Sequence, residues 1–255
     1  MPAIRLQRKQ LLIKCPKAKA DVTIEGCKLC EAMKKIAFSK VICNEEETQE
    51  KPEKKEITQD KKINIVYFDL ETKKLISDEL MKNQNQVPLD PLHFANLGMS
   101  VGITFNTLRS DYNIYYENNV QSLIHELLVA DAIVGFNHQK FDYSVLSAYM
   151  NRPQIKSLFA VKTLDLMLDL QGRLGHRVSL DSCVNATLGE SKSGDGIQAV
   201  KWFEEGKLDL IVEYCKKDVD VTRRLHEFGV KNKHIKFMDK FKVQTRSIFV
   251  DWEIK

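Results

Sequence analysis

The chain has 255 residues, of which 43% are hydrophobic and 29% charged, an ordinary globular mixture for one substantial core with room for a small additional module. Its 39 basic and 35 acidic residues give a formal net charge of +4, too slight a bias to identify a polyanionic partner. No apolar run is long enough for a membrane helix or a signal peptide, so we expect a cytoplasmic protein whose six cysteines form no disulfides.

Four of the cysteines stand near the N-terminus and predict a small metal-stapled module at residues 1–45. Cys27 and Cys30 form a C-x2-C knuckle in CKLC, and Cys15 and Cys43 can supply the outer ligands. Four thiolates make a closed tetrahedral Zn²⁺ site, and a segment this small needs such a staple to fold. Two alternatives remain open: an iron–sulfur cluster, which uses the same ligands, and four unrelated reduced thiols.

A charged strip follows the module, because residues 44–62 read NEEETQEKPEKKEITQDKK and contain a single aliphatic residue, Ile57. Nothing in this strip can pack a core, so we assign residues 46–62 to a flexible or partly ordered linker. Glu and Lys also form helices well, which makes a solvated helix the alternative. In either case the strip separates the module from a larger domain at residues 63–255.

The larger domain combines strand and helix patterns. Short apolar or alternating runs predict strands, and apolar residues at helical spacing predict helices. The strands are expected at 63–71, 98–106, 111–117, 131–137 and 160–167, and the helices at 120–130, at 142–150 and over most of 180–230. The last helix is expected to end at Gly229 as its C-terminal cap, and a strand or hairpin at 246–254 closes the chain. This order predicts an α/β fold with a mixed β-sheet flanked by helices.

Acidic residues stand at the ends or edges of three of these segments. Asp69 and Glu71 are two positions apart on a strand and therefore share a face. Asp142 opens a helix, and Asp218 lies on a later helix one turn after Tyr214. Taken singly, each acid has an ordinary explanation as a frayed strand end, a helix N-terminal residue or a surface acid. Taken together, the four carboxylates predict a site for two Mg²⁺ or Mn²⁺ ions about 4 Å apart, which serves in-line displacement at a phosphodiester.

The motifs FDLET, GFNHQKFD and YCKKD resemble, in order and spacing, the three motifs of the DEDD superfamily of 3′–5′ exonucleases, which have a ribonuclease H-like fold. Tyr214, four residues before Asp218, is similar to the tyrosine of the DEDDy branch. The resemblance covers about residues 63–230. The segments TLDLM, LGHRVSLDSC and LGESKSGDG are also similar to stand-alone or helicase-associated bacterial proteins of this branch.

The resemblance implies a role for each matching residue. Asp69, Glu71, Asp142 and Asp218 would hold the two metal ions, with Asp69 as the bridging ligand. Tyr214 would orient the nucleophilic water or help to deprotonate it. A free tyrosine has a pKa of about 10, so at neutral pH positioning the water is favoured over acting alone as the base.

Residues next to these motifs receive simpler interpretations. The resemblance implies that Thr72 and the backbone after Glu71 contact the terminal nucleotide and that Asn137 and Phe141 shape its pocket, although Phe141 can also be plain core. Cys215 is expected to face away from the metals as a small core hydrophobe, and Asp220 is expected to point into water.

The leading hypothesis is a metal-dependent 3′–5′ exonuclease that acts on the 3′ end of DNA or RNA and releases nucleoside 5′-monophosphates. The cysteine module would hold the nucleic acid or a partner, such as a helicase or another repair or processing protein. Basic residues around Cys15, together with Arg223 and Arg224, support phosphate contact. Two alternatives are a structure-selective endonuclease with the same metals and a non-catalytic nucleic-acid-binding module. Binding alone does not need every metal ligand, which argues against the second alternative.

Overall fold

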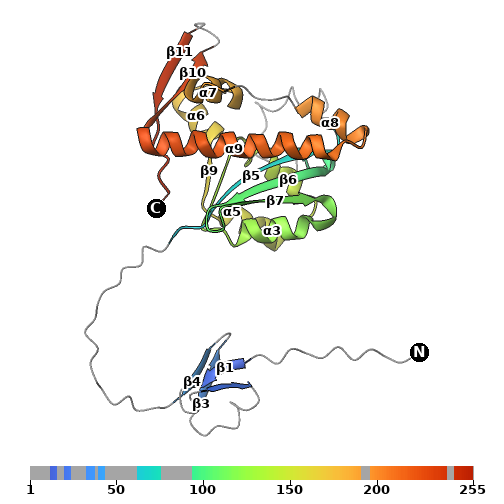
Figure 1. Ribbon diagram of the computed structural model, residues 1–255, viewed down its shortest axis with the longest axis vertical. Helices are drawn as coiled ribbons and strands as arrows, with labels where there is room; N and C mark the ends of the chain where they lie inside the picture. Colours follow the sequence, from blue (N-terminus) through green and yellow to red (C-terminus); the bar gives the residue numbers. More distant parts are fainter. Residues whose placement is uncertain are drawn as a thin grey trace. The chain divides into compact units, whose positions relative to one another are not determined.

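The structure is a computed structural model of the chain, and it divides into two compact units, Met1–Gln59 and Asp60–Lys255 (Figure 1). It describes the backbone of four short strands within the first unit. In the second unit it describes residues 62–75, 94–190, 196–239 and 244–254 with their side chains. Within these described residues, no helix combines the length and the apolar character that a membrane span requires.

The first unit contains two antiparallel strand pairs. β1 (Leu12–Cys15) pairs with β2 (Ala20–Thr23), and β3 (Met33–Ala37) pairs with β4 (Lys40–Cys43). The pairing of β3 with β4 has a register irregularity between Met33 and Lys35, where the strand shifts relative to its partner.

The predicted cysteine ligands fall only partly on these strands. Cys15 is the last residue of β1 and Cys43 is the last residue of β4, while Cys27 and Cys30 lie outside the described residues. The zinc module therefore stays a prediction. So does the charged linker, which lies outside the described residues except for Lys62.

A five-stranded mixed sheet organises the second unit, with strand order β7-β6-β5-β8-β9. The antiparallel half comprises β7 (Asp111–Tyr116), β6 (Met99–Asn106) and β5 (Ile65–Thr72). In the other half, β8 (Ala132–Gly135) runs parallel to β5, and β9 (Thr163–Asp165) runs parallel to β8. The predicted mixed sheet is thereby confirmed, and its central strand β5 carries the first acidic motif.

Helices cover both faces of the sheet, and Figure 1 shows α9 across one face with α3 and α5 on the other. The core on the α3 side is built by α3 (Val120–Leu128), α4 (Asp142–Ser147) and α5 (Arg152–Ala160). The core on the α9 side is built by α6 (Leu166–Leu174), α7 (Leu180–Leu188), α8 (Gly196–Glu204) and α9 (Leu208–Asn232). Two single turns of 3-10 helix, η1 (Ala95–Leu97) and η2 (Glu117–Asn119), flank the antiparallel strands.

The alternation of side chains along β5 assigns its acids to one of these two faces. Val66, Phe68 and Leu70 are buried in the core on the α3 side. Asp69 and Glu71 stand at the intervening positions, so their side chains project toward the opposite face, which α9 covers. The period of two in the sequence thus places both carboxylates against one helix.

Two α-helices and one strand of the second unit were not expected, and one expected strand is shorter. The predicted strand at 160–167 contains only β9, because the Asp165 side chain accepts hydrogen bonds from the first turn of α6 and starts a helix there. Helix α5, capped by Asn151, helix α6 and strand β10 (His234–Asp239) are the unexpected elements. The last strand, β11 (Gln244–Phe249), overlaps the strand or hairpin expected at 246–254 and pairs antiparallel with β10.

The prediction that α9 ends at Gly229 is wrong, since the helix continues to Asn232 and Lys233 takes the left-handed position after it. Packing explains the glycine instead. A Cβ atom at Gly229 would lie 2.4 Å from Cε3 of Trp252, an aromatic ring that is buried against α9. The absence of a side chain at this position lets the segment after β11 pack on the helix.

We therefore expect Gly229→Ala to lower the free energy of unfolding by about 1–3 kcal/mol, the usual cost of overpacking a core. Gly172→Ala is the matched control, because Gly172 is also helical and a Cβ there meets no atom within 4 Å. That control should gain about 0.5–1 kcal/mol from its better helix propensity. Urea denaturation of both variants checks the pair, and equal stability of the two variants would contradict the packing role of Gly229.

Candidate metal centre

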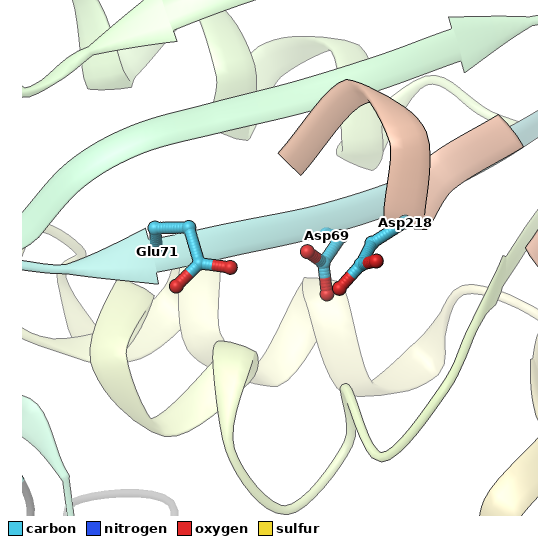
Figure 2. A group of neighbouring side chains, drawn as sticks. All are labelled: Asp69, Glu71 and Asp218. Carbon is cyan, nitrogen blue, oxygen red and sulfur yellow. The ribbon is translucent and has the colours of Figure 1, made fainter. Parts of the chain in front are cut away.

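Three carboxylates from two elements meet on the α9 side of the sheet. Asp69 and Glu71 come from β5, and Asp218 comes from α9. One carboxylate oxygen from each lies within 4.8 Å of the other two. Figure 2 shows Asp69 and Asp218 next to each other, with Glu71 further along β5. Glu71 and Asp218 are buried while Asp69 is partly exposed, so the group is open to solvent on the Asp69 side.

Asp142, the fourth predicted ligand, is the first residue of α4 and is buried beside this group. Its Oδ1 accepts a hydrogen bond of 3.0 Å from the backbone N–H of Leu70, the residue between the two acids of β5. Burial raises the pKa of the Asp142 carboxyl well above its ordinary value, and the charge of Asp69 adds to the effect. The structure thus brings three predicted ligands together and ties the fourth to the backbone of the strand that carries two of them.

Tyr214 lies one turn before Asp218 on α9 and is buried, as the helical spacing predicts. Burial raises the pKa of its phenol far above the ordinary value, and the negative charges of Asp218, Glu71 and Asp69 raise it further. The ring packs edge-on against Trp202 of α8, with 6.2 Å between centroids.

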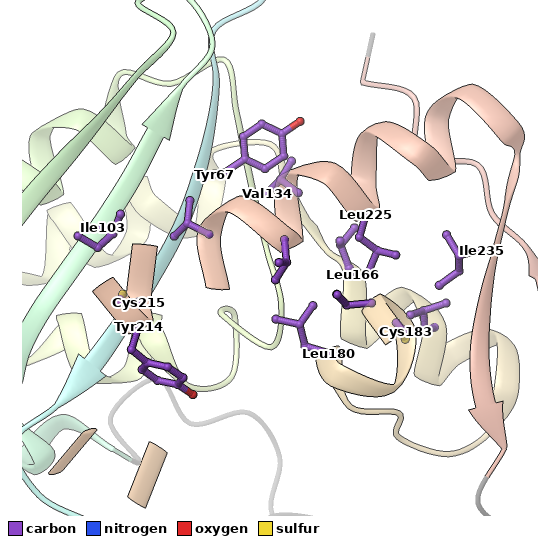
Figure 3. Close-up of a cluster of buried hydrophobic side chains, with 14 of the residues drawn as sticks. Tyr67, Ile103, Val134, Leu166, Leu180, Cys183, Tyr214, Cys215, Leu225 and Ile235 are labelled. Carbon is purple, nitrogen blue, oxygen red and sulfur yellow. The ribbon is translucent and has the colours of Figure 1, made fainter. Parts of the chain in front are cut away.

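Cys215 contradicts the expectation that its side chain faces away from the acids. Its Sγ lies 3.4 Å from the carbonyl oxygen of Asp69 and 3.5 Å from Oδ2 of the same residue. The helix α9 packs directly over β5, and Cys215 lies on the side of the helix that faces this strand. Figure 3 shows Tyr214 and Cys215 side by side on α9. Burial, followed by the charges of Asp69, Glu71 and Asp218, raises the pKa of the Cys215 thiol well above its ordinary value.

A pocket of about 420 Å³ opens beside two of the carboxylates. Asp69 and Asp218 form one part of its wall, and Asn137 and Arg177 are among the residues that form the rest. The residues lining this pocket do not include Thr72, whose hydroxyl donates to the carbonyl of Lys74, and they do not include Phe141. Of the three residues predicted to bind a nucleotide, Asn137 is the one placed here.

Phe141 packs in the core on the α3 side, where its ring lies 5.2 Å from that of Phe94. This position corresponds to the alternative that the sequence left open for it, plain core. Phe141 immediately precedes Asp142, the first residue of α4. Its packing in this core therefore helps to hold Asp142 in place.

Asp165 organises the pocket wall that contains Asn137. Its Oδ1 accepts the N–H of Asn137 at 2.8 Å and its Oδ2 accepts the N–H of Gln139 at 3.0 Å. The same carboxylate accepts the N–H groups of Met167 and Leu168 and so caps α6. Asn137 has a φ of 69°, a left-handed conformation that asparagine tolerates better than most residues. The two N–H donors of the loop after β8 and the two donors of α6 thus share one carboxylate, which ties the loop to the start of that helix.

Arg177 completes this wall, and its Nη2 donates to Oδ1 of Asn137 at 3.2 Å. Sequence reasoning missed both Asp165 and Arg177. Asp165 had a usable signal, because an acid directly before an apolar helical run is a common N-cap. Arg177 had no local signal, since only the tertiary fold brings it to Asn137, 40 residues earlier in the chain.

Asp220 does not point into water as expected. It accepts a hydrogen bond of 2.8 Å from the hydroxyl of Tyr112 and forms ion pairs with Arg223 and Arg224. Arg224 in turn pairs with Glu190, which ends the described segment before α8. Arg223 and Arg224, which the sequence offered as phosphate contacts, are thus engaged in a network on the surface of α9.

Residues 66–228 match the family model RNase_H_2, which is described as the RNase_H superfamily. The matched range covers 163 of the 255 residues and contains all four predicted acidic ligands and Tyr214. No curated protein matches the chain. The match agrees with the mixed sheet flanked by helices, which is a ribonuclease H-like fold.

Proposed function

Because this chain belongs to the RNase H superfamily, a membership that indicates a metal-dependent nuclease, we propose that it is a 3′–5′ exonuclease that hydrolyses phosphodiester bonds of DNA or RNA. The observation that carries the proposal is the pocket of about 420 Å³ beside Asp69 and Asp218. A volume of 300–1,000 Å³ is typical of pockets that enclose one small molecule. A site that holds one terminal nucleotide against the carboxylates acts at chain ends.

The donor set fits two Mg²⁺ or Mn²⁺ ions. Asp69, Glu71 and Asp218 offer carboxylate oxygens within 4.8 Å of one another, and hard oxygen ligands are what these ions prefer. Asp142 lies beside them and would complete the predicted set of ligands. When bound, the two ions would lower the pKa of a water molecule and neutralise charge on the leaving oxygen.

The chain's own groups would then position the reactants. We assign Tyr214 the task of orienting the attacking water or helping to deprotonate it, because it lies one turn before Asp218 on α9. Arg177 places a cation in the wall of the pocket that Asp69 and Asp218 also line, where a backbone phosphate of the substrate would lie. Asn137 holds that guanidinium in place through its Oδ1.

An end-label assay tests the proposal. Single- and double-stranded DNA and RNA, labelled at the 5′ end, are incubated with the full chain and Mn²⁺ or Mg²⁺. We expect a ladder that shortens from the 3′ end, release of nucleoside 5′-monophosphates, and loss of both when EDTA removes the ions. Internal cuts would favour the structure-selective endonuclease. Absence of cleavage with every substrate and metal would leave only a nucleic-acid-binding module.

The N-terminal cysteine module and a helicase or repair partner are carried into this proposal as predictions. The family match begins at residue 66, after the module. A single zinc ion per chain, found by metal analysis of the full protein, is the expected result for four thiolate ligands. An iron content in its place would indicate the iron–sulfur alternative.

We expect Arg177→Ala to raise KM for the nucleic acid about tenfold, since a hydrogen bond from a charged donor is worth about 1.5–3 kcal/mol. The affinity for Mn²⁺ should change less than KM, because Arg177 is not one of the predicted carboxylate ligands. Arg152→Ala is the control, since Arg152 is exposed at the start of α5, on the other side of the sheet. Steady-state kinetics on one oligonucleotide checks both variants, and an unchanged KM for Arg177→Ala would remove Arg177 from the substrate site.

A further inference from the structure

The second unit contains two cysteines, Cys183 and Cys215, and their surroundings differ. Cys183 in α7 is buried among apolar residues, and burial alone raises the pKa of its thiol to about 12. Cys215 in α9 is equally buried, but its sulfur lies against the main chain and the side chain of Asp69, at 3.4 and 3.5 Å. Packing explains Cys183 fully. For Cys215 there are in addition two polar contacts with one predicted metal ligand.

A thiol of ordinary pKa is protonated at neutral pH, so its S–H group acts as a weak hydrogen-bond donor. Both Asp69 oxygens that Cys215 reaches are acceptors, and the S···O distances suit a sulfur donor. Carboxylates that bind metals are commonly oriented by such outer hydrogen bonds, which set the direction of the free oxygen lone pairs. The thiol therefore contacts the Asp69 carboxylate, whose orientation matters for metal binding.

The position of Cys215 on its helix adds to this effect. Asp218 follows three residues later, so the two side chains are neighbours on the surface of α9. Through Cys215, α9 contacts β5 at Asp69, whose carboxylate lies close to that of Asp218. The backbone N–H of Leu70, the next residue of β5, donates to Asp142. Two contacts with other elements therefore hold β5 at the residues that carry its first acid.

We propose that Cys215 is a positioning residue of the metal centre, whose thiol donates to Asp69 and fixes that carboxylate in the orientation that faces Asp218. The proposal rests on the proposed function to the extent that it assumes divalent ions bind at these acids. It differs from a packing role, because it requires a donor at this position and not merely a group of the right size.

The test measures Mn²⁺ affinity of the full chain by electron paramagnetic resonance of the free ion. Cys215→Ala removes the donor, Cys215→Ser keeps a donor of similar size, and Cys183→Ala removes a buried thiol far from the acids in sequence and in a different helix. We expect Cys215→Ala to weaken Mn²⁺ binding about tenfold, the lower end of what loss of an outer hydrogen bond costs. Cys215→Ser and Cys183→Ala should stay within about threefold of the parent chain, well inside that loss.

A second measurement distinguishes a specific loss of Mn²⁺ affinity in Cys215→Ala from a general loss of stability. The Mn²⁺ concentration that gives half-maximal cleavage should rise about tenfold, while the rate at saturating Mn²⁺ returns to that of the parent. Equal Mn²⁺ affinity of Cys215→Ala and the parent chain would overturn the proposal, and so would equal losses in the alanine and serine variants. Mn²⁺ binding by the parent without any nuclease activity would refute the proposed function alone and leave the role of Cys215 standing. A parent chain that binds no Mn²⁺ would refute both.

Discussion

Replacing Asp69 with asparagine is expected to lower metal-dependent cleavage at least about 10³-fold, the upper end of what loss of one electrostatic group costs an enzyme. Asp69 takes part in each feature of this site. It shares the group of carboxylates with Glu71 and Asp218, it borders the pocket, and its charge acts on Asp142. A neutral amide cannot balance two divalent ions, so both the affinity for the ions and the rate should fall.

The same substitution should leave the fold intact in the absence of metal. Asp69, Glu71 and Asp218 are like charges held close together, and removing one of them relieves repulsion. Asp69→Asn is therefore expected to unfold at the same or a slightly higher urea concentration than the parent chain. Loss of activity together with retained stability separates a metal ligand from a structural acid.

Asp209→Asn supplies the matched control for this prediction. Asp209 lies on α9, the helix that carries Asp218, but it is exposed in the first turn. Its replacement should change the rate less than about twofold, because surface substitutions away from special features have small effects. Steady-state rates in Mn²⁺ check both variants. Full activity of Asp69→Asn would mean that the acidic group is not the metal centre.

The second large effect is expected at Asp165, where alanine should lower the free energy of unfolding by about 3 kcal/mol. The estimate combines the loss of a helix N-cap, about 1 kcal/mol, with the cost of leaving buried N–H groups unpaired, about 1–3 kcal/mol. Four backbone donors lose their acceptor in this variant. The loop that contains Asn137 should relax from its left-handed conformation, so KM should rise as well.

Asp165→Asn is expected to lower the free energy of unfolding by less than Asp165→Ala does. Asparagine keeps one acceptor oxygen, which can still serve Asn137 and the first turn of α6, but it has no second acceptor for Gln139. Its effect on stability should lie between the parent and alanine. Asp209→Ala, which replaces an exposed acid in the first turn of α9, should cost less than about 0.5 kcal/mol. Urea denaturation gives the order, and equal stability of Asp165→Ala and Asp209→Ala would contradict it.

Periodicity in the sequence was enough to predict where most of the acids lie. The period of two put Asp69 and Glu71 on one face of β5, and the helical period put Tyr214 one turn from Asp218. Both are local properties, so neither depends on knowing the fold. The sequence also predicted that these two segments come together, because isolated buried carboxylates are costly and a metal ion bound between them would remove that cost.

Contacts between distant segments account for what the sequence did not predict. Cys215 faces Asp69 across 146 positions of sequence, and Asp165 reaches the loop of Asn137 across 28. Gly229 looked like a helix cap because glycine commonly follows helices, but Trp252 requires it. In each case the residue type had a plausible local explanation, but a contact with a residue distant in the sequence determines its structural role.

Linear and circular forms of one single-stranded substrate test the central claim, that this site acts on chain ends, most directly. The two forms have the same sequence and differ only in whether a 3′ end exists. With Mn²⁺ we predict that the linear strand is degraded to nucleoside 5′-monophosphates and that the covalently closed circle stays intact over the same time. Cleavage of the circle at a comparable rate would contradict the account and identify an endonuclease.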